Sequence, residues 1–144
     1  LSRSFDNMAV LKGYELKLSR QLKEGSDVWL NTPRVTREAS GTSGMSAAMN
    51  GSINVSTNDG WICEFYENGV NSFVLPTVDH HLPTYEQDAQ DLNNLMDLLE
   101  NEIIPMYYSN RKKWNKIQLA SMNTVVPFFD SDRMADEYYQ KMYS

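Results

Sequence analysis

The chain has 144 residues, 41% of them apolar, and a formal net charge of −6. This length suits one domain, and the apolar content suits a buried core and argues against disorder. The negative charge argues against sequence-independent nucleic-acid binding, which needs clustered Lys and Arg, and no apolar run approaches the roughly 20 residues of a membrane span. The single cysteine, Cys63, cannot form an internal disulfide, so the expected compartment is the reducing cytoplasm.

The first half of the chain alternates short apolar runs with helix-forming segments. Strands are predicted at 7–14, 27–31, 53–56 and 71–75, and helices at 15–25 and 45–50. Gly25 should end the first helix, because glycine is the usual residue at a helix C-terminus. Such alternation predicts an α/β fold with a parallel sheet and covering helices.

After about residue 86 the pattern becomes helical. Apolar residues at helical spacing predict an amphipathic helix: Leu92, Leu95, Met96, Leu99 and Ile103. Pro105 should end or kink that helix, and a second helix over 110–122 should stop before Pro127. Asp130 or Ser131 can cap a last helix, which carries three apolar residues on one face, namely Met134, Tyr138 and Met142.

A glycine loop (residues 38–44) lies between the strand at 27–31 and the helix at 45–50. Backbone amides at the start of a helix, together with the helix dipole, form an anion site, and Thr42 and Ser43 add hydroxyl donors. Glu38 and Ser40 lie beside them, where they could bind the hydroxyls of a neutral ligand. Ligands collect at the carboxyl ends of strands in such sheets. A tight turn without a ligand fits the same pattern, whereas a Walker-type phosphate loop and a dinucleotide fingerprint do not.

The sequence EASGTSGMSAAMNG at 38–51, with DVWLNTP at 27–33 before it and DGW at 59–61 after it, resembles the α-glucan phosphorylases, especially their bacterial and archaeal branch. The similarity runs from about Met8 to Tyr143. That family has two Rossmann-like domains facing a cleft, the GT-B arrangement. The resemblance implies that residues 1–144 are the C-terminal portion of the second domain with a helical C-terminal tail, and the start without methionine fits a piece of a larger chain.

Phosphorylases transfer glucosyl units between an α-1,4-glucan (glycogen, starch or maltodextrin) and phosphate to give glucose 1-phosphate, and their cofactor is pyridoxal phosphate. The resemblance implies a substrate-binding set of Glu38, Ser40, Gly41 and Tyr14, and a cofactor-binding set of Thr42, Ser43 and Gly44. Tyr14 is assigned only by its position 24 residues before Glu38. Expected partners are the glucan, phosphate or glucose 1-phosphate, the missing N-terminal part of the parent, and a second copy in a homodimer, with no nucleic acid or membrane.

Ser46 departs from the family, where this position is the lysine that forms the Schiff base with the cofactor. Serine cannot form an imine, which leaves three interpretations open. The cofactor binds non-covalently through its phosphate, or the parent is a cofactor-free retaining glucosyltransferase of the glycogen-synthase kind, or the site is a non-catalytic glucan-binding or regulatory module. The Arg and Lys residues that the family uses on the substrate phosphate are absent, so the chain alone is expected to be inactive.

Several other residues have a simpler expected role. His80 and His81, near Asp79, Glu86 and Asp88, suggest a metal, but adjacent side chains on an extended loop point opposite ways, so we expect a solvated loop and no metal.

Aromatic, cysteine and arginine residues near the loop complete the sequence predictions. Trp61, Phe65 and Tyr66 are predicted to pack in the core rather than stack on sugars. Cys63 is predicted to be a half-buried, unreactive residue. Arg34 and Arg37 either steer anions or lie on the surface.

Overall fold

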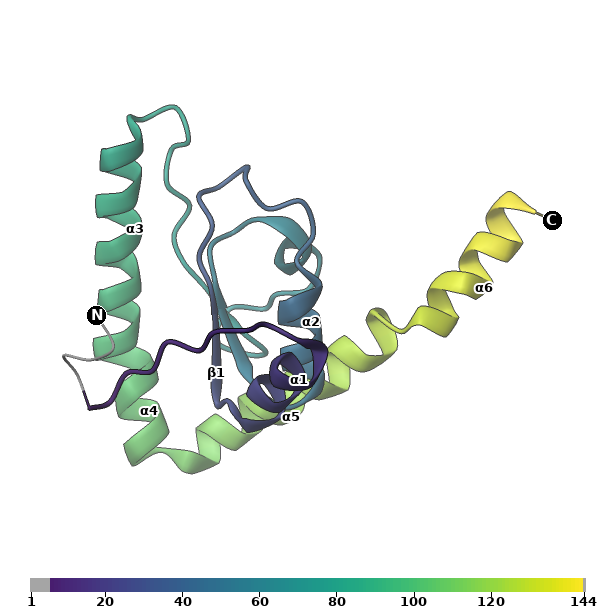
Figure 1. Cartoon of the computed structure of the whole chain (residues 1–144), viewed down its shortest axis with the longest axis horizontal. Helices are drawn as coiled ribbons and strands as arrows, with labels where there is room; N and C mark the ends of the chain where they lie inside the picture. The colour runs from purple at the N-terminus through teal and green to yellow at the C-terminus, as the bar shows by residue number, and fades with distance from the viewer. Residues whose placement is uncertain (1–5, 144) are drawn as a thin grey trace.

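The computed structural model describes residues 6–143 and contains a three-stranded parallel sheet in the order β1-β2-β3 (Figure 1). The strands are β1 (Val28–Asn31), β2 (Ile53–Ser56) and β3 (Phe73–Val74). Val28 is paired with Ile53, and Val55 with Phe73. The predicted α/β fold with a parallel sheet is therefore confirmed, with β3 shorter than the predicted 71–75.

Helices fill most of the remaining chain. They are α1 (Leu16–Gly25), α2 (Thr42–Met49), the 3-10 helix η2 (Gly60–Glu64), α3 (Thr84–Leu98), the π-helix η3 (Leu99–Ile103), α4 (Ile104–Ser109), α5 (Arg111–Phe128) and α6 (Ser131–Met142). The first helix ends at Gly25, as predicted.

The central strand β2 is buried along its whole length and divides two layers of core. Ile53 and Val55 point to one face, where they pack in a cluster with Trp114 and residues of η3 and α4. Successive residues of a strand face opposite ways, so Asn54 points to the other face, where its amide donates to the Gly44 carbonyl of α2 at 3.0 Å. The sheet thus places α2 on one face and the α3–α4 helical segment on the other.

The predicted strand at 7–14 is wrong. Residues 8–14 have no regular structure, and their apolar side chains are exposed, among them Met8, Val10 and Leu11. An extended segment becomes a strand only when a neighbouring backbone accepts its hydrogen bonds. The sheet of residues 6–143 consists of β1, β2 and β3 alone, so this segment pairs with no strand of the described chain.

Neither proline stops a helix where predicted. The π-helix η3 ends at Ile103, and α4 follows from Ile104 to Ser109 with Pro105 in its first turn. Because proline lacks an amide hydrogen and its ring displaces the carbonyl four residues earlier, the wider π turn accommodates it without ending the helix. Pro127 lies inside the last turn of α5, which ends one residue later at Phe128.

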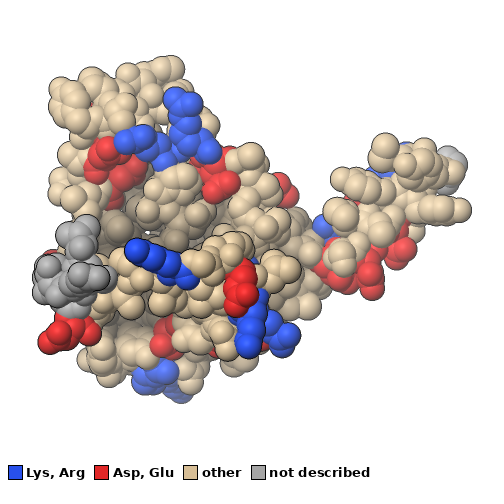
Figure 2. All heavy atoms as spheres, in the orientation of Figure 1, with Lys and Arg blue, Asp and Glu red and all other residues tan. Residues whose placement is uncertain are grey.

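The last helix, α6, begins where predicted, because the Asp130 carboxylate accepts a hydrogen bond from the Asp132 amide. The helix extends away from the sheet (Figure 1), and Met134, Tyr138 and Met142 are all exposed on it. Within residues 6–143, no helix combines the length and apolar character needed to cross a membrane. Basic and acidic side chains are interspersed over the face that Figure 2 shows.

Candidate functional site

The candidate site lies at the carboxyl edge of the sheet. Because the strands are parallel, the segments that follow β1, β2 and β3 all leave at this edge (Figure 1). The glycine loop belongs to the connection after β1, and residues 57–61 follow β2. The fold therefore brings these two segments together at the edge where ligands of open α/β sheets bind.

Asp59 holds the start of the glycine loop. Its Oδ2 atom accepts hydrogen bonds from the main-chain amides of Arg37 and Glu38, both at 2.9 Å, and its Oδ1 atom accepts one from Gly60 at 3.0 Å. The Trp61 amide donates to the Ser40 carbonyl at 2.8 Å. Three hydrogen bonds thus fasten residues 37–40 to residues 59–61.

Two glycines permit this close approach. Gly60 has φ +67°, and a Cβ there would lie 2.6 Å from Glu38 Cγ and 2.7 Å from the Ser40 carbonyl oxygen. Gly41 has φ +92°, and a Cβ there would lie 3.4 Å from the carboxyl carbon of Glu38. The Glu38 side chain therefore lies against Gly41, beside the start of α2, and does not face away from the loop.

The start of α2 presents unpaired amides. The helix begins at Thr42, three residues earlier than predicted, and Gly41 caps it with backbone in the left-handed region and no capping side chain. The Gly44 amide donates to the Gly41 carbonyl at 3.2 Å, while the amides of Thr42 and Ser43 have no hydrogen-bond acceptor within residues 6–143. Thr42 is exposed. Two such amides at an open helix N-terminus can bind an oxyanion.

Gly44 is fixed by packing. It is buried, and a Cβ there would lie 2.6 Å from Trp61 Nε1 and 2.9 Å from Asn54 Oδ1. The first turn of α2 therefore sits directly on Trp61 and Asn54, which sets the direction of the free amides. Contact between Gly44 and a cofactor stays a prediction.

Ser46 lies one helical turn after Thr42, and its hydroxyl donates to the Thr42 carbonyl at 3.0 Å. Serine commonly makes this bond to its own helix. A serine has no amine, so position 46 cannot form an imine with a cofactor. The half-buried hydroxyl already donates its hydrogen to Thr42 and is therefore no free donor at the helix start.

The predicted substrate set is brought together only in part. Glu38, Ser40 and Gly41 share one loop beside the free amides, whereas Tyr14 is 79% exposed and makes no hydrogen bond within the described residues. Its placement near a phosphate stays a prediction.

Sequence reasoning missed two residues that shape the site. Asp59 holds the loop and Asn54 holds α2, yet neither was singled out as more than part of a motif or strand. The Asp-Gly pair directly after a predicted strand was the available signal, since Asp in that position commonly bonds nearby amides.

The aromatic residues near the loop belong mostly to the core. Trp61 and Phe65 are buried as predicted, with ring centroids 5.0 Å apart, while Tyr66 is exposed. Cys63 is exposed rather than half-buried. Although the residue is exposed, partial desolvation of its thiol and the charge of Asp59 raise the pKa of Cys63, which favours the unreactive thiol over the thiolate.

Arg34 binds a carboxylate instead of facing the loop. Its guanidinium donates to both carboxylate oxygens of Asp88, at 2.6 and 2.8 Å. This hydrogen-bonded pair lowers the pKa of Asp88. Desolvation and the neighbouring Asp88 charge raise the pKa of Asp91. Arg34 therefore has a surface ion-pair role, one of its two expected roles.

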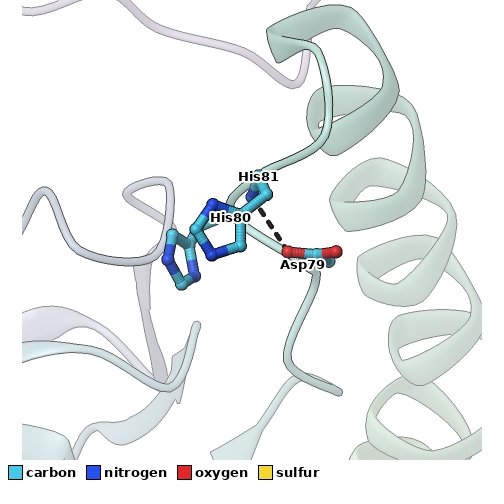
Figure 3. A group of neighbouring side chains, drawn as sticks. All are labelled: Asp79, His80 and His81. Carbon is cyan, nitrogen blue, oxygen red and sulfur yellow. Dashed lines mark hydrogen bonds between the residues drawn. The ribbon is translucent and has the colours of Figure 1, made fainter.

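The prediction that His80 and His81 point opposite ways is wrong. The two residues occupy a turn, not an extended loop, and their ring centroids are 4.0 Å apart. Asp79, His80 and His81 each offer a ligand atom, and these atoms lie within 4.8 Å of one another (Figure 3).

The fold and the loop define a class: a parallel α/β unit in which an open helix N-terminus lies beside a carboxylate. No family model matches the chain. The chain is 42% identical to a maltodextrin phosphorylase of Thermococcus litoralis over 96% of its length, and 37% identical to a glycogen phosphorylase of Aquifex aeolicus over 95%. It is also 43% identical over 99% of its length to an uncharacterized protein of Methanocaldococcus jannaschii.

The resemblance to the α-glucan phosphorylase family is therefore confirmed over nearly the whole chain. The match covers only part of each relative: 17% of the Thermococcus protein, 20% of the Aquifex protein and 26% of the Methanocaldococcus protein. The chain is thus similar to one segment of proteins several times its length.

Proposed function

We propose that the chain is the C-terminal portion of the second Rossmann-like domain of a GT-B glycosyltransferase, which transfers glucosyl units between an α-1,4-glucan and phosphate. The relatives named maltodextrin and glycogen phosphorylase support this role. The observation that carries it is the pair of free amides at Thr42 and Ser43, which open beside the Glu38 carboxylate.

In this proposal the two halves of the loop bind different parts of the ligand. The Thr42 and Ser43 amides bind a phosphate oxygen, because a helix start attracts anions without the cost of desolvating a second charged group. Glu38 and Ser40 bind sugar hydroxyls, for which a carboxylate is a strong acceptor. Asp59 fixes the backbone at Glu38 and so holds the carboxylate of Glu38 in position beside the amides of α2. Such preorganised groups are what electrostatic catalysis depends on.

Pyridoxal phosphate, which the family implies, fits this loop only in part. The free amides suit its phosphate group, which supplies proton transfer to the substrate phosphate when the cofactor is bound. The Schiff-base position does not fit, because Ser46 carries a hydroxyl bonded to Thr42. Any binding of this cofactor by the chain is therefore non-covalent at position 46.

The serine at position 46, which has no amine for a Schiff base, favours a second candidate, a cofactor-free retaining glucosyltransferase or a non-catalytic glucan-binding module. Both would still use Glu38 and Ser40 to bind sugar hydroxyls, and neither needs an amine at position 46. A cytoplasmic location stays an expectation, and it depends on the single cysteine of the chain.

One assay of the natural full-length protein separates these candidates. The purified protein is incubated with maltodextrin and phosphate, with and without pyridoxal phosphate, and glucose 1-phosphate is measured. We expect glucose 1-phosphate to form, with a rate that rises when the cofactor is added. Glucan extension from UDP- or ADP-glucose in a parallel incubation, with no glucose 1-phosphate formed from phosphate, supports the cofactor-free transferase. Glucan binding without turnover in any of these incubations overturns the proposed activity and supports the binding module.

A further inference from the structure

The connection between β3 and α3 contains a turn that no part of the proposed glucosyl transfer uses. We call residues 79–82 the histidine turn. The Leu82 amide donates to the Asp79 carbonyl at 3.2 Å, and the His81 amide donates to Asp79 Oδ1 at 2.9 Å. Figure 3 shows the side chains of the turn on the segment that leads into the helix. His80 and His81 occupy the two central positions, and the closed turn brings their rings side by side.

Gln87 of α3 is hydrogen-bonded to the backbone of the histidine turn. The Gln87 side chain is buried, and its amide nitrogen donates to the carbonyls of His80 and Leu82 at 3.2 and 2.6 Å. Val78, directly before the turn, is also buried. Because the backbone is fixed on both sides, the exposed side chains of Asp79, His80 and His81 start from one defined arrangement. A ligand set arranged in advance loses less conformational entropy when an ion binds.

We propose that Asp79, His80 and His81 form a site for a divalent transition-metal ion of the zinc class. Two imidazoles and one carboxylate are the protein ligands of a common type of zinc site, in which water fills the fourth position. Imidazole ligands favour zinc, copper or nickel over magnesium and calcium, which select oxygen ligands.

The geometry requires only side-chain adjustment. In a tetrahedral site, ligand atoms at about 2.0–2.2 Å from one zinc ion lie about 3.3–3.6 Å apart. The ligand atoms of the turn already lie within 4.8 Å of one another, and all three side chains are exposed. Asp79 Oδ1 accepts the His81 amide, which leaves the Oδ2 atom of this carboxylate for an ion. The turn backbone can therefore stay in place while the rings and the carboxylate close on the ion.

The composition makes this site easy to test, because His80 and His81 are the only two histidines among the 144 residues. Isothermal titration calorimetry of the intact chain with Zn²⁺ should show one ion per chain. Each of the variants His80→Ala and His81→Ala should bind Zn²⁺ at least about tenfold more weakly. Cys63→Ser serves as the matched control, since it removes the only thiol of the chain, and it should bind Zn²⁺ as the parent does.

A second measurement on the unmutated chain covers the case in which a variant fails to fold. The imidazole proton resonances of both histidines should move together when Zn²⁺ is added, with saturation at one equivalent. Absence of Zn²⁺ binding by the unmutated chain, full affinity in both histidine variants, or loss of binding in Cys63→Ser would each overturn the proposal. Zn²⁺ binding that leaves both imidazole resonances unchanged would overturn it as well.

Discussion

The carboxylate of Asp59 accepts the main-chain amide hydrogen bond of Glu38 at 2.9 Å, across an interval of 21 residues. The same carboxylate accepts the amides of Arg37 and Gly60, so one side chain joins the end of the β2 connection to the glycine loop. The position of the Glu38 side chain beside the free amides of α2 therefore depends on Asp59.

Replacing this carboxylate should loosen the loop and destabilise the fold. Asp59→Ala removes three charge-assisted hydrogen bonds at a half-buried position, and we expect a loss of about 2 kcal/mol in the free energy of unfolding. Urea denaturation measures the loss, and hydrogen exchange should show faster exchange at the Glu38 amide. Asp136→Ala, at an exposed position of α6, is the control and should change stability by less than about 0.5 kcal/mol. Equal stability of the two variants would contradict the role of Asp59.

A methyl group at position 44 should strain the contact between α2 and Trp61. Alanine favours a helix over glycine by about 1 kcal/mol, but overpacking costs typically about 1–3 kcal/mol. With a Cβ only 2.6 Å from Trp61 Nε1, we expect the overpacking cost to exceed the helix gain in Gly44→Ala, with a net loss of about 1 kcal/mol.

Gly25→Ala is the matched control for this substitution. Gly25 is the last residue of α1, and a Cβ there has no heavy atom within 4 Å. Thermal unfolding should show an unchanged or higher melting temperature for Gly25→Ala and a lower one for Gly44→Ala. A melting temperature for Gly44→Ala at or above that of Gly25→Ala would show that the packing around Trp61 yields easily.

The ionised carboxylates of Asp91 and Asp88 should have opposite effects on the free energy of unfolding at neutral pH. Desolvation raises the pKa of Asp91, and its Oδ1 atom has no hydrogen-bond partner within residues 6–143. The folded state therefore binds this proton more tightly than the unfolded state does, and the ionised carboxylate destabilises the fold at neutral pH. Asp91→Asn should be modestly more stable than the parent at pH 7, and the gain should disappear below the usual carboxyl pKa of about 3.9.

Asp88→Asn should have the opposite effect. The hydrogen-bonded pair with Arg34 lowers the pKa of Asp88, so its contribution to stability is present at neutral pH and is lost as the pH falls through the lowered pKa. Denaturant unfolding at pH 7 and at pH 3 should therefore show a small loss for Asp88→Asn at pH 7 and a smaller loss at pH 3. A loss for both variants at pH 7 would contradict the desolvation of Asp91.

Restoring an amine at position 46 should restore covalent chemistry. Ser46→Lys gives up one hydrogen bond to the Thr42 carbonyl and places a primary amine one turn from the free amides. With added pyridoxal phosphate, borohydride reduction should fix the cofactor at position 46 in this variant, which peptide mass spectrometry can locate. Labelling spread over the native lysines, with none at position 46, would show that the loop does not orient this cofactor.

Sequence patterns predicted the three strands of the sheet, together with a fourth at 7–14 that does not form. The runs at 27–31 and 53–56 lie where β1 and β2 form, because Val28, Ile53 and Val55 pack against one core cluster with residues of η3, α4 and α5. The equally apolar run at 7–14 stays irregular, since strand formation depends on a neighbour that local sequence does not specify. Pro105 follows a π turn for a similar reason: packing of Ile103 and Met106 in the core favours continuation of the helix.

The candidate site was predictable in its residues more than in its geometry. The helix dipole and the glycines indicated an anion site near Thr42, and the free amides there agree with that reasoning. The contribution of Asp59 depends on two loops that meet only in the folded sheet. The approach of His80 to His81 depends on a turn fixed by Gln87, seven residues beyond His80. Such tertiary contacts have no periodic pattern in the sequence.

A titration of the ¹⁵N-labelled chain with glucose 1-phosphate, followed by nuclear magnetic resonance, shows whether the glycine loop binds an oxyanion. The Thr42 and Ser43 amide resonances should move saturably, and Glu38→Gln should weaken binding of glucose 1-phosphate more than binding of inorganic phosphate. If both ligands leave these two amide resonances unchanged, the glycine loop is not an oxyanion site.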